Sequence, residues 1–230
     1  MSDETPRIEV TIAAPVDAVW DALRDKDKIR HWHGWEFAGL DDEIDLIYFK
    51  HMTEDAEART LGVQDGDLIR LEPDGEGTRV TLTRAPHGAD PDWDAYYDDI
   101  TEGWITFLHQ LRFAVERQPG VPRRTVFLNG HNKSGRSLAD DLGLGGARVT
   151  LVGAEADAEV WYRSDHQLGV ALNIWGDGLL VVASSGPTEA KPDGTAMAIL
   201  STYGLDDSTM DSLTARWQAW WTQRYGPLPE

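Results

Sequence analysis

The feature that most constrains the fold is a break near the middle of the chain, Gln118-Pro119-Gly120-Val121-Pro122. A long helical pattern precedes this segment, and two prolines with a glycine stop it because proline lacks the backbone N–H that a helix needs. At 230 residues the chain is long enough for one large domain or for two smaller ones. The break therefore predicts a domain at residues 1–117, a linker at 118–122 and a second domain at 123–230.

The first half begins with a half-buried strand, since Ile8, Val10 and Ile12 alternate with polar residues. An apolar stripe from Val16 to Leu23 then predicts an amphipathic helix, with Pro15 in its first turn. Turn-forming sequences separate the segments that follow. We expect strands at 43–50, 57–63, 67–72 and 78–84, and then a long helix at 94–117.

The second half repeats this order of elements with a different sequence. Gly176-Asp177-Gly178 is a strong tight-turn sequence between two of its strands, and Ser208 with Asp211 resembles the capping pair of a final helix. Runs of strands that end in a helix indicate an α+β fold rather than a parallel α/β sheet. We expect a strand at 125–128, a short helix at 135–142, and strands at 147–153, 157–163, 168–175, 179–184 and 195–203.

The charge of the chain narrows the classes of partner. The sequence has 40 acidic and 21 basic residues, a net charge of −19, and most of the excess lies in the first half. A surface this acidic repels phosphate backbones and anionic membranes, so we expect no nucleic-acid partner and no membrane insertion. A solvated surface is the simplest interpretation of the acidic half, and a docking face for a basic protein is the alternative.

The sequence also predicts a cytoplasmic protein. The start, Met1-Ser2-Asp3-Glu4, is acidic and no apolar run follows it, so a signal peptide is not expected. No stretch approaches the roughly 18 apolar residues that a membrane helix needs. The chain has no cysteine, which excludes disulfides and thiolate sites and suits a reducing compartment.

The first half resembles the SRPBCC superfamily, whose members have the START or Bet v 1-like fold, and within it the family related to the activator of Hsp90 ATPase. The resemblance covers about residues 5–117, and three segments carry it in the expected order. The second half is similar only in its element order and its tryptophan-rich last helix, which suggests a diverged second copy. The three segments are Ile8 to Leu23 with Ala14-Pro15 between strand and helix, His31-Trp32-His33-Gly34-Trp35, and Glu102-Gly103-Trp104 through to Leu111.

This resemblance implies a helix-grip fold, in which a curved antiparallel sheet surrounds a long C-terminal helix and leaves an apolar cavity between them. The aromatic face of the helix at 94–117 supports the same arrangement, because Trp104 and Phe107 are too bulky to meet a sheet easily without gaps. Gly103 either provides space for a strand or ligand or is a tolerated weak position. The candidate lining residues are Trp32, Trp35, Tyr48, Val80, Leu82, Trp104, Leu108 and Leu111.

The two histidines at 31 and 33 leave several interpretations open. His31 and His33 could bind a metal from an extended segment, could stand at the mouth of the cavity beside Trp32 and Trp35, or could belong to aromatic packing under a loop. No nucleophile elbow or phosphate-binding loop is present in the sequence. We therefore predict no catalytic residue, no metal site and no cofactor.

The leading functional hypothesis is non-catalytic binding of a small hydrophobic or amphipathic ligand in the cavity of the first half. A protein-interaction module, similar to the co-chaperone branch of the family, is the second hypothesis, and the acidic surface is the reason for it. The third is an enzyme similar to polyketide cyclases and aromatases, in which His31, His33, His51 or Tyr48 would act as acid or base if it lined the cavity.

Overall fold

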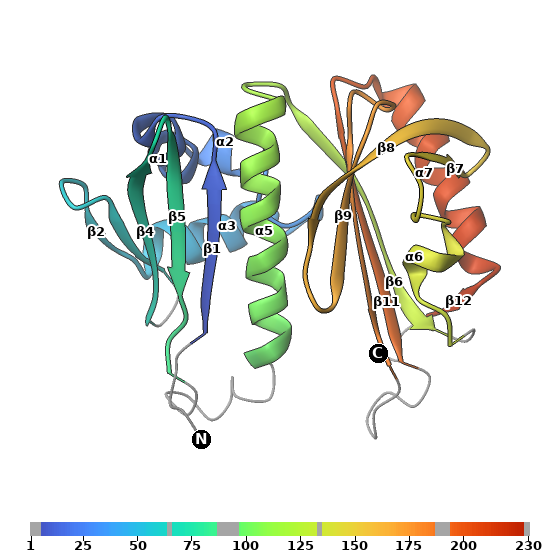
Figure 1. Ribbon diagram of the computed structural model, residues 1–230, viewed down its shortest axis with the longest axis horizontal. Helices are drawn as coiled ribbons and strands as arrows, with labels where there is room; N and C mark the ends of the chain where they lie inside the picture. Colours follow the sequence, from blue (N-terminus) through green and yellow to red (C-terminus); the bar gives the residue numbers. More distant parts are fainter. Residues whose placement is uncertain (1–5, 64–65, 87–96, 133–134, 187–193, 228–230) are drawn as a thin grey trace. The chain divides into compact units, whose positions relative to one another are not determined.

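The computed structural model describes residues 6–63, 66–86, 97–132, 135–186 and 194–227. These residues divide into two compact units, Met1–Val121 and Pro122–Glu230 (Figure 1). Each unit has its own buried apolar cluster. Each is therefore described by itself.

The first unit contains one antiparallel sheet in the order β1-β5-β4-β3-β2. Val10 and Ile12 of the first strand are buried as the alternating pattern predicts. The strands are β1 (Arg7–Ile12), β2 (Thr53–Asp55), β3 (Thr60–Val63), β4 (Asp67–Asp74) and β5 (Gly77–Thr83). The helices are α1 (Val16–Arg24), α2 (Lys26–Ile29), α3 (Leu40–Asp45), the π-helix η1 (Leu46–Lys50) and α5 (Tyr97–Arg117).

The long helix α5 runs beside β1 and packs against it (Figure 1). Its face toward the sheet carries Trp104, Leu108 and Leu111, which are all buried in the apolar cluster of the unit. The added Cβ of an alanine at Gly103 would lie 3.9 Å from the ring of Phe107, an ordinary contact. Among the described residues, therefore, no close neighbour requires a glycine at this position, which speaks against a role in making space for a strand.

The strand predicted at 43–50 is wrong, because this segment forms α3 and the π-helix η1. The buried side chains are Ile44, Ile47 and Tyr48, at the spacing of three and one that a helix brings to one face. Leu46, which a strand would place on the same face as Ile44 and Tyr48, is 48% exposed. The acidic residues in the first turn of α3 also favour the positive end of a helix dipole.

The second unit contains a seven-stranded antiparallel sheet in the order β12-β6-β11-β10-β9-β8-β7. In both units the first strand pairs with the last strand before the long C-terminal helix. In the first unit this pair is β1 with β5, and in the second it is β6 with β11. The strands are β6 (Arg123–Asn132), β7 (Arg148–Leu151), β8 (Ala154–Arg163), β9 (Gln167–Leu172), β10 (Leu179–Ser185), β11 (Thr195–Tyr203) and β12 (Tyr225–Gly226). The helices are α6 (Leu138–Asp141) and α7 (Asp207–Thr222).

Helix α7 packs against β6 with a buried face of Met210, Leu213, Trp217 and Trp221. The predicted Ser208–Asp211 capping pair is wrong. Asp206 is the N-cap, and its carboxylate accepts a hydrogen bond from the backbone N–H of Thr209 at 2.8 Å. The N-cap therefore lies two residues earlier than predicted, at an aspartate, which is also a favoured N-cap residue.

The predicted α+β class is confirmed, with a strongly curled antiparallel sheet and a C-terminal helix. Among the residues that the structure describes, no helix combines the length and the apolar composition needed to cross a lipid bilayer.

Candidate functional site

Seven of the eight predicted cavity residues lie in the buried apolar cluster of the first unit. Trp35 is the exception, since it is half-buried and lies outside that cluster. The other seven come from α5, from β5, from η1 and from the turn after α2. They are Trp32, Tyr48, Val80, Leu82, Trp104, Leu108 and Leu111.

The polar atoms of the three buried aromatic residues in this set already have partners inside the unit. The indole N–H of Trp32 donates to the Ala22 carbonyl oxygen at 2.9 Å. That of Trp104 donates to the Asp67 carboxylate, also at 2.9 Å, and the hydroxyl of Tyr48 lies 3.0 Å from His33 Nδ1. Sequence reasoning missed Asp67, because its contact with Trp104 spans 37 residues of chain.

His33 joins Tyr48 to Glu43 in a chain of hydrogen bonds. Its Nε2 lies 3.0 Å from a carboxylate oxygen of Glu43, while both His33 and Tyr48 are fully buried and the Glu43 side chain is 37% exposed. A carboxylate only accepts hydrogen bonds, so Nε2 carries the proton and Nδ1 accepts from the Tyr48 hydroxyl. Burial, and secondarily the charge of Glu43, raises the pKa of Tyr48 well above its ordinary value.

Aromatic rings enclose this Glu43–His33–Tyr48 relay. The ring of Phe107 lies 4.5 Å from that of His33, and the ring of Trp104 lies 6.4 Å from that of Tyr48, measured between centroids. Tyr48 is placed by a π-helix, a rare element that is frequent at functional sites. Among the described ranges no group of three or more side chains is arranged to hold a metal ion.

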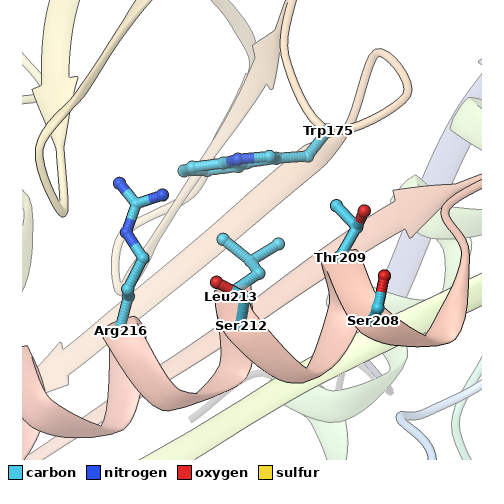
Figure 2. A pocket seen from close by; sticks show the side chains of 6 residues that line it. All are labelled: Trp175, Ser208, Thr209, Ser212, Leu213 and Arg216. Atoms are coloured by element: carbon cyan, nitrogen blue, oxygen red, sulfur yellow. The ribbon is translucent and has the colours of Figure 1, made fainter.

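A pocket of about 280 Å³ lies on α7 in the second unit (Figure 2). The ring of Trp175, from the loop between β9 and β10, lies above the helix, with Arg216 near one end and Ser208 and Thr209 near the other. We call this pocket the α7 groove. Its lining residues are Trp175, Ser208, Thr209, Ser212, Leu213 and Arg216.

At the Trp175 wall of the groove, the backbone has a conformation that few residues adopt. Trp175, Gly176 and Asp177 all have positive φ angles, of 58°, 77° and 52°. The Trp175 carbonyl oxygen accepts a hydrogen bond from the Tyr203 N–H at 3.3 Å, and a Cβ on Gly176 would collide with the Tyr203 carbonyl oxygen. The loop is therefore fixed against β11, which fixes the point at which the indole side chain leaves the backbone.

The Arg216 wall of the groove is fixed in a similar way. The Nε and one Nη of Arg216 donate to the Val152 carbonyl oxygen, with the Nε bond at 3.2 Å. Val152 and Gly153 form the tight turn between β7 and β8, with positive φ angles of 44° and 83°. Positive φ is strained for a β-branched valine. The guanidinium makes no ion pair with any residue of the described ranges.

Sequence reasoning missed the α7 groove. Trp175 was expected at the end of a strand at 168–175, whereas β9 ends at Leu172 and Trp175 lies in the loop. The signals were present in the turn sequence directly after Trp175 and in the spacing of Ser212 and Arg216, which brings residues i and i+4 to one face of a helix.

No protein-family model and no curated protein matches the sequence. Among solved structures, DynU16 from the dynemicin biosynthetic locus is 18% identical over 96% of both chains, with a TM-score of 0.32. The di-domain ARO/CYC BexL from the BE-7585A pathway is 12% identical over 94% of this chain and 92% of that one, with a TM-score of 0.38. The di-domain ARO/CYC StfQ from the steffimycin pathway is 12% identical over 92% and 91%, with a TM-score of 0.35. At such low identities and TM-scores the similarity carries no conclusion about this chain's activity.

Proposed function

We propose that the chain binds a small amphipathic molecule in the α7 groove of its second unit. The observation that carries this proposal is a pocket of about 280 Å³ with an aromatic ring on one wall and hydroxyl and guanidinium groups on the other. Binding sites for small molecules are concave, largely apolar and provided with a few oriented polar groups. The volume is just below the roughly 300 Å³ at which that class begins, which favours a ligand of one or two rings.

Backbone strain at both walls supports the same proposal. Among the described residues, four other than glycine have positive φ, and three of them, Val152, Trp175 and Asp177, lie in the two loops beside the groove. Strained residues persist where the surrounding structure holds them, and they gather at ligand sites.

Binding at the groove is tested by NMR on the full chain labelled with ¹⁵N, with a library of small aromatic and aliphatic compounds. We expect hits to shift the indole N–H signal of Trp175, assigned by its loss in Trp175→Phe, and to leave Trp32 and Trp104 unchanged. Hits that shift Trp32 and Trp104 alone would instead place the ligand in the first unit, as the sequence predicted. The half-buried Trp35, replaced by Phe, serves as the matched control.

The Glu43–His33–Tyr48 relay favours a second candidate function, an acid–base enzyme similar to the polyketide cyclases and aromatases. In such an enzyme Tyr48, which its raised pKa keeps protonated, would donate its phenolic proton to the substrate as a general acid, while the Glu43–His33 pair orients its hydroxyl. A linear poly-β-ketone would be the test substrate, followed by the absorbance of its cyclised product. We expect the wild-type chain to turn over this substrate, Tyr48→Phe to abolish the turnover and Trp175→Phe to retain it. Equal turnover in the wild type and in Tyr48→Phe would exclude a catalytic role for Tyr48.

We also propose that the two units are copies of one helix-grip fold of the SRPBCC type, the second diverged. The topology supports this, because β1 pairs with β5 and β6 pairs with β11, so each first strand lies beside the last strand of its run. Each run then ends in a long helix, α5 or α7. The strand β12 after α7 is a feature of the second unit.

A further inference from the structure

The α7 groove has an acidic end and a basic end. At the start of α7 the Asp206 carboxylate caps the helix and accepts a hydrogen bond from the Ser208 hydroxyl at 2.7 Å. Those bonds lower the pKa of Asp206, so it is negatively charged at neutral pH. Almost three turns further on, Arg216 supplies a permanent positive charge. A charged ligand must therefore place its anion at Arg216 and not at the helix start.

Arg216 is available for such an anion. A guanidinium has five N–H donors in a fixed fork. The two bonds to the Val152 carbonyl oxygen use Nε–H and one N–H of one Nη, so one N–H on that Nη and two on the other remain for an end-on pair of bonds. In a chain with a net charge of −19, most exposed arginines pair with an acid, for example Arg124 with Asp207 and Arg148 with Asp157. Arg216 has no such partner among the described residues.

A hydroxyl stands one helical turn before this guanidinium. Ser212 precedes Arg216 by four residues, so the two side chains share the groove face of α7. The Ser212 hydroxyl makes no hydrogen bond to a described residue. An unengaged hydroxyl beside an unpaired guanidinium is the donor set that a carboxylate accepts.

We infer that the ligand of the α7 groove is a planar aromatic carboxylate, its ring stacked on Trp175 and its carboxylate bound by Arg216 and Ser212. The inference rests on the proposed function and specifies its ligand. Stacking on the half-buried indole selects a flat ring system over an aliphatic one. The Arg216 fork selects a carboxylate, because its geometry matches two parallel N–H···O bonds.

The length of the groove limits the size of the ligand. Ser208 and Arg216 are eight residues apart, which corresponds to about 12 Å along the helix at 1.5 Å per residue. A fused two-ring carboxylate fits this length with its acid at the Arg216 end and its rings between Trp175 and Leu213, extending toward Thr209. A longer chain would meet the negative charge of Asp206, so the second end of the ligand should be uncharged.

The test is a calorimetric and NMR titration of the full chain with three probes: 2-naphthoate, its neutral amide 2-naphthamide, and the non-planar cyclohexanecarboxylate. We expect 2-naphthoate to bind about tenfold tighter than either of the others. The neutral amide loses the stronger hydrogen bonds that a charged group accepts, and cyclohexanecarboxylate loses the stacking on Trp175. Inorganic phosphate, added as a competitor, should displace 2-naphthoate weakly, since it cannot stack on Trp175.

Variants assign the preference to individual groups. Arg216→Gln should make the chain bind 2-naphthoate and 2-naphthamide equally, whereas Arg163→Gln, a charge-matched change on β8 of the same unit, should keep the wild-type preference. Because Arg216→Gln also removes the bonds to Val152, Arg216→Lys is included; it keeps the charge and should keep part of the preference. Circular dichroism checks that each variant is folded.

The outcomes separate the inference from the proposed function. If all three probes shift the Trp175 indole signal with equal affinity, the groove binds small molecules but the carboxylate inference is wrong. If 2-naphthoate binds preferentially but Arg216→Gln leaves that preference intact, the assignment to Arg216 is wrong. If no probe binds at millimolar concentration, both the inference and the binding function of the groove are wrong.

Discussion

At the residue scale, the Asp67 carboxylate of the first unit accepts from three different residues. It accepts from the Arg84 guanidinium at 3.0 Å, from the Ala85 backbone N–H at 2.8 Å and from the Trp104 indole at 2.9 Å. Both members of the ion pair are almost completely buried. A buried ion pair of this kind adds little net stability compared with apolar packing. Removing one partner is nevertheless costly, because the other charge stays buried without a counter-charge.

We therefore expect Asp67→Asn to lower the free energy of unfolding by about 3–5 kcal/mol, the usual cost of breaking a buried ion pair. Urea denaturation followed by circular dichroism measures this value. Asp74→Asn is the matched control, because Asp74 pairs with Arg79 at 3.1 Å on the surface of the same sheet and should cost no more than about 1 kcal/mol. Equal effects of the two substitutions would contradict the importance of burial here.

At the element scale, the sequence predicted most helices and strands because their apolar periods are clear. The alternation in β1 and the stripe of α5 both appear as predicted, with Val10, Ile12, Trp104 and Leu108 buried. The segment 43–50 failed because Ile44, Leu46 and Tyr48 also fit a period of two, and only tertiary packing decides between the two periods. The sequence did not predict the α7 groove for another reason. A strained loop and a helix face form this groove, and the two segments lie far apart in the sequence.

Gly103 lies in the interior of α5, and replacing it with alanine tests how much this glycine weakens the helix. Gly103→Ala should raise the free energy of unfolding by about 1 kcal/mol, the difference in helix propensity between the two residues, because the new Cβ meets only the ring of Phe107 at ordinary distance. Urea denaturation gives the value. A loss of stability would show that the position needs its small side chain after all, which the sequence alone had left open.

Gly176→Ala in the loop after β9 provides the opposite case. Its φ of 77° and the collision of a Cβ with the Tyr203 carbonyl oxygen predict a clear loss of stability. The same denaturation experiment measures it, and the shift of the Trp175 indole signal reports whether the loop has moved.

At the scale of the whole molecule, the two units have separate buried clusters. The cluster of the first unit includes Leu23 and Trp32, and that of the second includes Leu213 and Trp217. Each cluster unites its own sheet with its own long helix, so the contacts that hold one unit together lie within that unit. Two domains of this kind are expected to unfold as separate cooperative transitions.

Leucine-to-alanine substitutions in the full chain test this separation. Leu23 and Leu213 are both at most 2% exposed, and removing a buried leucine side chain costs about 2–5 kcal/mol. We expect Leu23→Ala to lower the urea midpoint at the Trp32 indole N–H signal and leave that of Trp217 unchanged, and Leu213→Ala to do the reverse. If each substitution lowers both midpoints equally, the chain unfolds as one body, and its stability must be assigned to contacts that the two clusters do not contain.

If the midpoints separate, ligand binding at the α7 groove should raise the Trp217 midpoint alone, because a ligand stabilises only the unit that binds it.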